Sequence, residues 1–256
     1  MMQKEDSPLR VIPLGIGDFF SRYNYTTTLL VRGGTTRLLI DCPEPVRKVL
    51  FESTSAAGEV VDAFDIDAVL LTHLHGDHSN GLEGFGFYRK QMKGSPGRPA
   101  LYALPENLDG LWERKLKASM GRSYLPEKGI DSTSTLDNYF DPHPIEPGQP
   151  FAIGDLVVEV MRTRHPVSCV GCKIRYGGRT FGYSSDTDFD PKLIAFLEEA
   201  DLIFHECNEG VHTTVDELSM LPEPLRRKMR LVHLSDDFNR QQSNIEPAEA
   251  GRMYIV

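Results

Sequence analysis

Apolar residues along the chain are grouped in short runs separated by glycine, proline and polar residues, a pattern that predicts strands interspersed with helices. In the first half, strand-like runs occupy residues 11–17, 26–34, 36–43, 65–73 and 97–105, and helix-like stretches occupy 45–57 and 106–120. Gly33 and Gly34 lie between two of these strands and indicate a hairpin. Residues 121–150 are rich in Gly, Pro, Ser, Thr and Asp, and we interpret them as a surface excursion, with a lid as one form that it can take.

The second half of the chain repeats this arrangement. Strand-like runs occupy 150–165, 168–178, 179–188, 201–208 and 231–237, with a helix at 190–200 and a broken helix at 214–229. Asp190 is a good N-cap for the first of these helices, and Pro191 suits its first position. Two strand-rich halves, each with helices, predict two sheets packed face to face with helices outside. We therefore expect the α/β class, as one domain over residues 1–256 with a four-layer αββα sandwich.

Composition and charge narrow the function classes. The 256 residues are 40% hydrophobic, enough to bury a sizeable core. The formal net charge of -9 argues against a surface built mainly to bind a nucleic-acid backbone. The first ten residues carry charges of both signs, and no later stretch has the roughly 18 uninterrupted apolar residues of a membrane span. We expect a cytoplasmic protein that does not bind membranes.

Chemistry is concentrated in the segment THLHGDHSNG, residues 72–81. A strand-like run ends here in three histidines and an aspartate within six positions. Side chains alternate along an extended chain, so His73 and His75 point the same way and can bind one divalent ion. Asp77 and His78 can face a second ion. A single histidine is more often structural, but four such groups at the end of an apolar strand favour a metal site.

The pattern His-x-His-x-Asp-His resembles the signature of the metallo-β-lactamase superfamily of two-metal hydrolases, and the resemblance extends over nearly the whole chain. It implies three more ligands in the segments TRHP, YSSDTD and LVHLSDD, namely His165, Asp186 and His233. By this resemblance, one ion is held by His73, His75 and His165. The other is held by Asp77, His78 and His233, with Asp186 between the two.

Two more aspartates bear on this ligand set. Asp41, in LLIDCP, matches a family aspartate that supports the metal loop from behind the ligands. Asp188 is an alternative to Asp186 as the bridging carboxylate, but Asp186 fits the turn position better.

The resemblance implies two divalent metal ions as cofactors, with zinc first and manganese or iron as alternatives. Two ions about 3.5–4 Å apart lower the pKa of a shared water to about 7 and stabilise charge on an attacked carbonyl or phosphoryl group. We therefore expect hydrolysis by a metal-bridging hydroxide. The fold alone does not give the substrate, because the superfamily includes β-lactamases, lactonases, thioester hydrolases, nucleases and phosphodiesterases.

The segment ADLIFHECNEGVHTT, residues 200–214, is similar to the ribonuclease Z-like phosphodiesterase branch, where a strand ends in His-Glu and His-Ser/Thr-Thr follows. The matching residues are Glu206 and His212. A histidine can protonate a leaving alkoxide, and a carboxylate orients its ring and raises its pKa. With Asp77 they are the candidate catalytic residues. The alternative is that Glu206 and His212 cap a helix or lie in an exposed loop.

Several alternatives remain for the substrate and partners. The ribonuclease has a glycine- and proline-rich arm that grips tRNA, whereas the nearest basic stretch here, residues 88–98, is short. We therefore favour a small or nucleotide-type phosphodiester, such as a cyclic nucleotide, over tRNA. A hydrolase of lactones, thioesters or other carbonyl esters is the alternative enzyme. A metal-bound redox enzyme or an inactive binding module is a third class, and the complete ligand set argues against inactivity. A homodimer is left open.

The remaining cysteines and histidines have plainer interpretations. Four cysteines in a chain of this length do not indicate a disulfide framework. Cys169 and Cys172 form a lone CxxC, and we interpret them as strand residues in preference to a redox or third-metal site. His143, in DPHP, is expected in an exposed polar loop.

Overall fold

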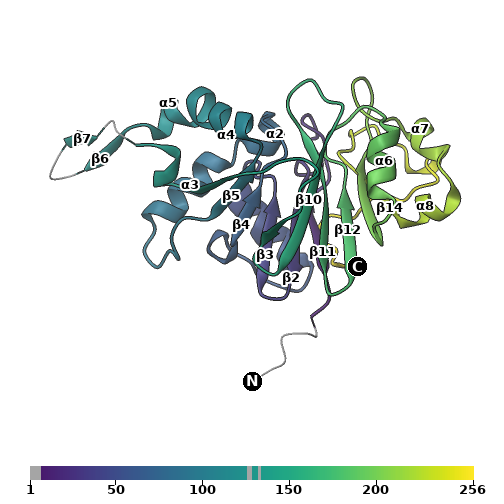
Figure 1. The fold of residues 1–256 in the computed structure, drawn as a ribbon, viewed down its shortest axis with the longest axis horizontal. Coiled ribbons are helices and arrows are strands. Elements are labelled where there is room, and N and C mark those ends of the chain that lie inside the picture. Colours follow the sequence, from purple (N-terminus) through teal and green to yellow (C-terminus); the bar gives the residue numbers. More distant parts are fainter. Residues whose placement is uncertain (1–6, 126–128, 132–133) are drawn as a thin grey trace.

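The computed structural model describes residues 7–125, 129–131 and 134–256, and two mixed β-sheets face each other at its centre (Figure 1). The first sheet has seven strands in the order β15-β1-β2-β3-β4-β5-β8. Their bounds are β1 Arg10–Gly15, β2 Thr28–Gly33, β3 Thr36–Ile40, β4 Ala68–Leu70, β5 Ala100–Ala103, β8 Asp141–Pro144 and β15 Tyr254–Ile255. The strands from β3 to β8 are parallel, whereas β15, β1, β2 and β3 pair antiparallel.

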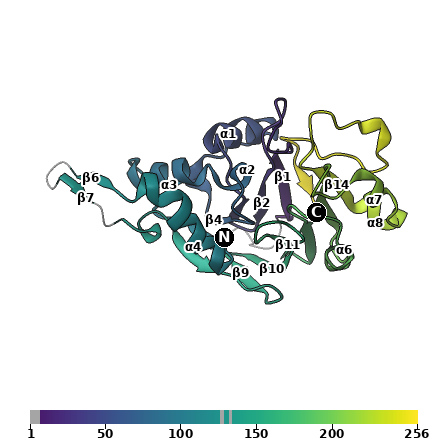
Figure 2. The same ribbon diagram turned by 90° about the horizontal axis from the view of Figure 1, so that it is seen from above.

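The second sheet has six strands in the order β14-β13-β12-β11-β10-β9. Their bounds are β9 Phe151–Ile153, β10 Leu156–Arg162, β11 Val170–Tyr176, β12 Arg179–Tyr183, β13 Leu202–Glu206 and β14 Met229–Val232. Here too one end is parallel, because β12, β13 and β14 run in the same direction. A separate hairpin of β6 (Ser123–Leu125) and β7 (Gly129–Asp131) projects from the body of the protein (Figure 2).

Helices cover the outer face of each sheet and complete the four predicted layers (Figure 1). The helices beside the first sheet are α1 Val46–Ala56, α2 Gly76–Ser79, α3 Leu82–Gln91, α4 Pro105–Leu111 and α5 Lys117–Met120. The helices beside the second sheet are α6 Pro191–Leu197, α7 Val215–Ser219 and α8 Glu223–Lys228. The Asp190 side chain accepts a hydrogen bond from Lys192 N, which confirms it as the N-cap of α6.

Alternation along the strands explains why the first sheet is buried on both faces. In β1, Val11 belongs to the core between the sheets, whereas Ile12 packs in the core under the outer helices. In β3, Leu38 likewise belongs to the core between the sheets, and Leu39 packs in the core under the outer helices. Strands that are buried on both faces consist of nearly continuous apolar residues. Such runs can be recognised in the sequence.

The helical pattern was incompletely predicted. Helix α3 was not predicted, because its segment contains Gly84 and Gly86, which disfavour a helix. A Cβ at Gly86 would lie 2.9 Å from Met120 Cε, so the close packing of α3 requires glycine there. The predicted helix 106–120 is interrupted by a π-helical turn, Trp112–Leu116.

The predicted surface excursion at 121–150 is also partly corrected. Its residues 141–144 form β8, which pairs with β5 and extends the first sheet. His143 therefore lies on a strand, half-buried and stacked on the Tyr102 ring, and not in an exposed loop. The lid remains a prediction, and residues 126–128 and 132–133 lie outside the described residues.

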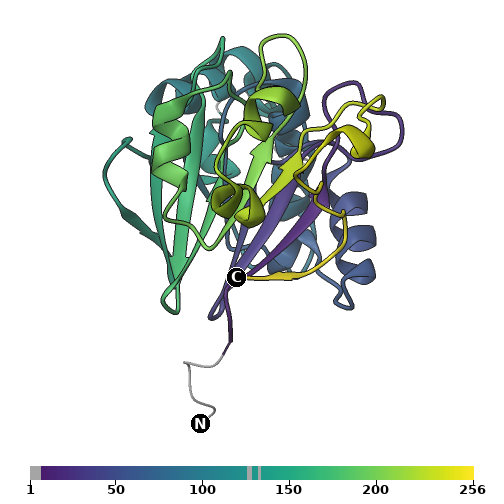
Figure 3. The same cartoon turned by 90° about the vertical axis from the view of Figure 1, so that its right-hand side faces the viewer.

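The carboxyl ends of the strands create a site at one edge of the sandwich. In open α/β sheets, loops that follow parallel strands meet at the same edge. The two sheets are joined there, because Leu234 N donates to Ile16 O at 2.9 Å and Asp18 N donates to Leu234 O at 3.1 Å. Figure 3 shows β14 and its following loop beside the amino-terminal strands.

Candidate metal centre

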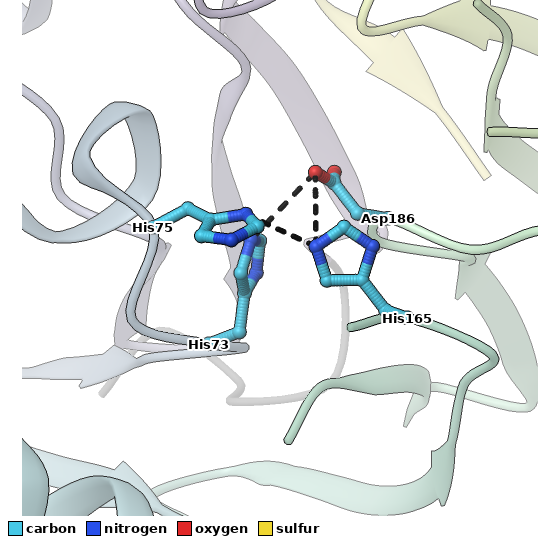
Figure 4. A group of neighbouring side chains, drawn as sticks. All are labelled: His73, His75, His165 and Asp186. Carbon is cyan, nitrogen blue, oxygen red and sulfur yellow. Dashed lines mark hydrogen bonds and ion pairs between the residues drawn. The ribbon is translucent and has the colours of Figure 1, made fainter. Parts of the chain in front are cut away.

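Four of the predicted ligands converge in a first group (Figure 4). His73 lies after β4, His75 is the N-cap of α2, His165 follows β10, and Asp186 follows β12. One ligand atom from each lies within 4.8 Å of the others. His75 Nδ1 is 3.0 Å from His165 Nε2, and Asp186 Oδ2 is 3.6 Å from His73 Nε2.

A second group contains Asp77, His78, Asp186 and His233, all of them buried. Asp77 and His78 are adjacent on the short helix α2, and His233 follows β14. His78 Nε2 lies 3.3 Å from Asp186 Oδ1, whereas His233 Nε2 lies 3.6 Å from Asp186 Oδ2. Asp186 thus belongs to both groups and presents an oxygen to each, as a bridging carboxylate must.

Asp188 does not share this position. It is exposed, and its Oδ1 accepts a hydrogen bond from the backbone N–H of Phe189. The aspartate that lies beside the histidine ligands is therefore Asp186 and not Asp188.

Asp41 supports the second group from behind. Its buried carboxylate accepts from Thr72 N at 2.8 Å and contacts His78 Nδ1 at 2.8 Å. This contact fixes the ring so that Nε2 faces the other ligands, the arrangement typical of metal-bound histidines. Behind His73, Nδ1 lies 3.0 Å from the Thr72 hydroxyl oxygen and 3.6 Å from Cys169 Sγ. Cys169 and Cys172 are both buried and form no disulfide; Cys172 lies in β11 as predicted, whereas Cys169 directly precedes that strand.

The backbone at the site is strained. In the described part of the chain, three non-glycine residues have positive φ: Asp41 at 60°, Ser185 at 52° and His233 at 59°. Each directly follows or nearly follows a strand that ends at the site. A non-glycine residue in this conformation is uncommon and persists where the surrounding structure imposes it. The sheets therefore hold these loops in a fixed geometry.

The donor set fits divalent cations. Among the described residues, the buried atoms His73 Nε2, His78 Nε2 and Asp186 Oδ1 have no hydrogen-bond partner, although they face one another across the site. Burial disfavours a proton on His78, but the charges of Asp186 and Asp41 outweigh burial and raise its pKa well above the ordinary value. The site thus attracts positive charge that a cation can supply in place of a proton. Imidazole and carboxylate donors suit zinc, manganese and iron alike.

Glu206 and His212 form a pair beside these groups. Glu206 ends β13 with its side chain buried, and its Oε1 is 2.9 Å from His212 Nδ1. The His212 ring lies between those of His165 and His233, with centroids at 5.9 and 5.1 Å. The predicted pair is therefore in place, and the alternative that the two residues cap a helix is wrong, because Thr214 caps α7.

The pair holds a proton near neutral pH. Burial raises the pKa of Glu206 to about 8, despite the hydrogen bond from His212. Burial lowers the pKa of His212, but the hydrogen bond and charge of Glu206 outweigh it and leave that pKa raised. Two groups in such close contact titrate as one unit.

A pocket of about 420 Å³ opens onto this cluster. Its lining residues are Phe19, Phe20, His75, Gly76, Asp77, Asp186, His212 and His233. A hollow of about 570 Å³ lies elsewhere, beside Tyr102, His143 and Phe151. None of the candidate metal ligands lines this second hollow. The pocket of about 420 Å³ is therefore the candidate active site.

Sequence reasoning missed several residues of the site. Phe19 and Phe20 were not singled out, although two adjacent aromatic residues in a polar loop were a visible signal. Lys115 was also missed. Its Nζ donates to Leu74 O at 2.8 Å and to Ser79 Oγ at 2.6 Å, and so supports the loop that carries His75 and Asp77. Nothing in the local sequence predicts this contact, which depends on the π-helical turn.

Comparison with known proteins places the chain in a family. Residues 9–255 match the family described as anti-Pycsar protein Apyc1. The chain belongs to the Apyc1 family. A curated member from Paenibacillus sp. (strain J14) is 34% identical over 237 residues, covering 90% of each chain. The match therefore spans both sheets and every residue of the metal centre.

Solved structures with the same fold include the metallo-β-lactamase fold protein YhfI from Bacillus subtilis, with TM-score 0.75, 23% identity and coverage of 97% of this chain and 100% of the other. The short form of human tRNase Z gives a TM-score of 0.69 at 20% identity, with 96% and 98% covered. These likenesses confirm the predicted metallo-β-lactamase fold. At such identities they show the fold alone.

Together, the Apyc1 family, the fold and the two ligand groups support a metal-dependent hydrolase. In the part of the chain that the structure describes, no helix combines the length and apolar character needed to cross a bilayer.

Proposed function

We propose that the protein is a two-metal phosphodiesterase that hydrolyses a small nucleotide-type phosphodiester, a cyclic nucleotide. The observation that carries this proposal is the Glu206–His212 pair at the edge of the metal centre. Membership of the Apyc1 family supports the cyclic nucleotide, because anti-Pycsar activity implies a substrate of this class. Zinc is the proposed metal.

The protein groups have distinct roles in this reaction. Divalent ions held by the seven ligands would supply Lewis acidity, which would lower the pKa of water and neutralise charge on the phosphoryl oxygens. Asp77 lines the pocket, and its carboxylate belongs to the second group alone, whereas the carboxylate of Asp186 belongs to both groups. Glu206 binds Nδ1 of His212 and so leaves Nε2 as the atom available to the substrate.

Hydrolysis then needs one proton at a defined place. The oxygen of water bonds to phosphorus, a proton of that water passes to solvent, and the bond from phosphorus to the leaving ribose oxygen breaks. A ribose alkoxide is strongly basic and leaves poorly without a proton. His212 Nε2 donates that proton, and the ring regains one from solvent while Glu206 keeps its orientation.

A tRNA substrate is not favoured by the surface. In the nearest basic stretch, Arg89 is buried, and its guanidinium donates to the carbonyl oxygens of Ala63, Ile66 and Gly97. Lys90 lies 4.0 Å from the centre of the Tyr139 ring. These two cations are engaged within the protein.

The experiment compares leaving groups in the His212→Ala variant. We expect its turnover of an alkyl phosphodiester or a cyclic nucleotide to fall by roughly 10²–10⁴-fold, the range typical of a general acid. A nitrophenyl phosphodiester releases a weakly basic phenolate, so its turnover should fall far less. Both metals should stay bound, as measured by elemental analysis.

His143→Ala is the matched control, because His143 also pairs with a carboxylate, Asp141, at 3.0 Å but lies outside the pocket. It should leave both rates unchanged. Equal losses on both substrates in His212→Ala would contradict proton donation. Faster turnover of lactones or thioesters than of any phosphodiester by the unmodified enzyme would instead favour a carbonyl-ester hydrolase.

A further inference from the structure

Two exposed aromatic rings stand at the mouth of the catalytic pocket. Phe20 is 82% exposed and Phe19 is 51% exposed, although phenylalanine side chains are usually buried. Both line the pocket with the metal ligands. The rings meet edge to face, with centroids 5.2 Å apart and an interplanar angle of 67°. Neither the fold nor the proposed proton transfer explains why large apolar surfaces are kept in water at this place.

The loop that carries these rings is held firmly. Phe20 N donates to Asp18 Oδ1 at 3.0 Å, and Asp236 accepts from Ser21 Oγ at 2.7 Å and from Arg22 N at 3.0 Å. The backbone hydrogen bond from Arg22 and that from Ser21 lower the pKa of Asp236 to about 2, so it is ionised at neutral pH. The exposure of the rings is therefore a fixed feature, and binding against them costs little ordering of the loop.

The same loop is tied to both sides of the reaction centre. Asn208 Nδ2 donates to Asp18 Oδ2 at 3.0 Å, which connects it to the loop that contains His212. On the other side, a Cβ added at Gly76 would lie 3.0 Å from Phe19 Cε2, so the Phe19 ring lies against the metal loop. The rings therefore have a set position relative to the groups that act on the phosphate.

The remaining lining of the pocket limits what the rings can contact. Apart from Phe19 and Phe20, the described lining residues are the metal ligands, His212 and Gly76. The ligands and His212 are occupied with the phosphodiester and its leaving group. In this lining, only the two rings remain for the organic part of the substrate.

We propose that Phe19 and Phe20 form a stacking platform for the nucleobase of the substrate. This inference rests on the proposed function for the identity of the ligand, a nucleotide. Stacking uses the flat face that every base has, so the platform accepts purines and pyrimidines and favours the larger purine ring. The class of substrate is thus set by the phosphodiester, and the base adds affinity without strict selection.

The test measures binding and not turnover. Metal-loaded protein is titrated by calorimetry with a nucleoside 5′-monophosphate and, separately, with ribose 5-phosphate, which lacks the base. The unmodified protein should bind the nucleotide roughly 5- to 150-fold more tightly, the range for one stacked base. The double variant Phe19→Ala/Phe20→Ala should bring this ratio close to one without changing the affinity for ribose 5-phosphate. Adenine should exceed cytosine in the unmodified protein and lose this advantage in the variant.

Two further variants separate stacking from general effects. Phe20→Leu keeps apolar area but loses the aromatic face, so its ratio should be intermediate. Tyr23→Ala is the matched control, because Tyr23 is 76% exposed on the same loop but does not line the pocket. Its ratio should equal that of the unmodified protein. Thermal unfolding and metal content show that each variant is folded and loaded.

The outcomes distinguish the platform from the proposed function. A ratio near one in the unmodified protein overturns the platform, as does a double variant that weakens both ligands equally. An equal loss in Tyr23→Ala overturns it too, since the effect would then belong to the loop as a whole. A higher affinity for the nucleotide than for ribose 5-phosphate that depends on the two rings would support the platform. If the same protein hydrolyses no cyclic nucleotide, only the proposed function is overturned.

Discussion

The two ligand groups share Asp186 but differ in how they are supported. In the second group, every ligand is buried, and two carboxylates contribute, those of Asp77 and Asp186. In the first group, His75 is half-buried at the pocket and Asp186 is the sole carboxylate. Asp41 fixes the ring of His78 with a charged hydrogen bond, whereas two neutral groups, the Thr72 hydroxyl and the Cys169 thiol, lie behind His73.

This difference predicts unequal ions. More negative charge and a firmer outer contact strengthen the binding of a cation. We therefore expect the second group to hold the tighter, more structural ion and the first group the looser one. The predictions below test this asymmetry, from the largest expected effect to the smallest.

Removing the carboxylate of Asp186, which both groups share, should abolish the difference in metal affinity between the two groups. Asp186→Ala takes a ligand from both groups, so both ions and the activity should be lost together, an effect larger than the 10–100-fold typical of an outer partner. Elemental analysis and rate measurement check this. Asp188→Ala should be mild, because that side chain is exposed. A greater loss in Asp188→Ala than in Asp186→Ala would show that the bridging residue is wrongly assigned.

Weakening the outer contact should affect one ion. Asp41→Asn removes the charge, but asparagine tolerates the positive φ of this position. We expect the affinity of the tighter ion to fall by roughly 10–100-fold and that of the looser ion to change little, as measured by metal titration. Equal weakening of both ions would refute the asymmetry.

Gradual removal of metal should occur in two steps. If the groups differ as described, a competing chelator should remove one ion per chain at a concentration roughly ten-fold or more below that needed for the second, at the lower limit of an outer-contact effect. Activity should disappear with the first ion, whereas most of the thermal stabilisation should be lost with the second. Loss of both ions at the same chelator concentration would contradict the predicted difference in affinity between the two groups.

The thiol behind His73 should matter least. Cys169→Ala removes a weak hydrogen-bonding group, so the affinity of the looser ion should change by less than the roughly ten-fold lower limit seen for stronger outer partners. Titration of the metal-free variant measures this. A change as large as that in Asp41→Asn would mean that the thiol supports His73 as firmly as the carboxylate supports His78.

The cluster from His73 to His78 was visible in the sequence because it follows an apolar strand, and the resemblance to a known family implied the other three ligands. His73, Asp186 and His233 come directly or almost directly after β4, β12 and β14, and strand ends can be read from hydrophobic runs. Asp186 was preferred to Asp188 from its place in a turn, and its burial agrees with that preference. The four layers followed from the order of strands and helices.

The rest depends on contacts between residues far apart in the chain. Gly86 disfavours a helix locally, but contact with Met120 and Phe140 makes glycine necessary there. The fixed loop under Phe20 needs Asp236, which is 215 positions from Ser21. Strand β8 forms from DPHP only because β5 lies beside it. Propensity and periodicity describe neighbours in sequence and carry no information on such partners.

The junction of the two sheets has a consequence for how the protein is made. His233 N donates to Thr27 Oγ1, a residue 206 positions earlier, so the last ligand is placed by a residue that directly precedes β2 and is synthesised early. During translation, the loop with His73 and His78 emerges long before this partner. The nascent chain therefore carries an incomplete set of ligands until the second sheet has formed, and contacts of such long range form slowly. If the two proposed metal ions bind, their loading follows the closing of the sandwich, as a late event in the maturation of the protein.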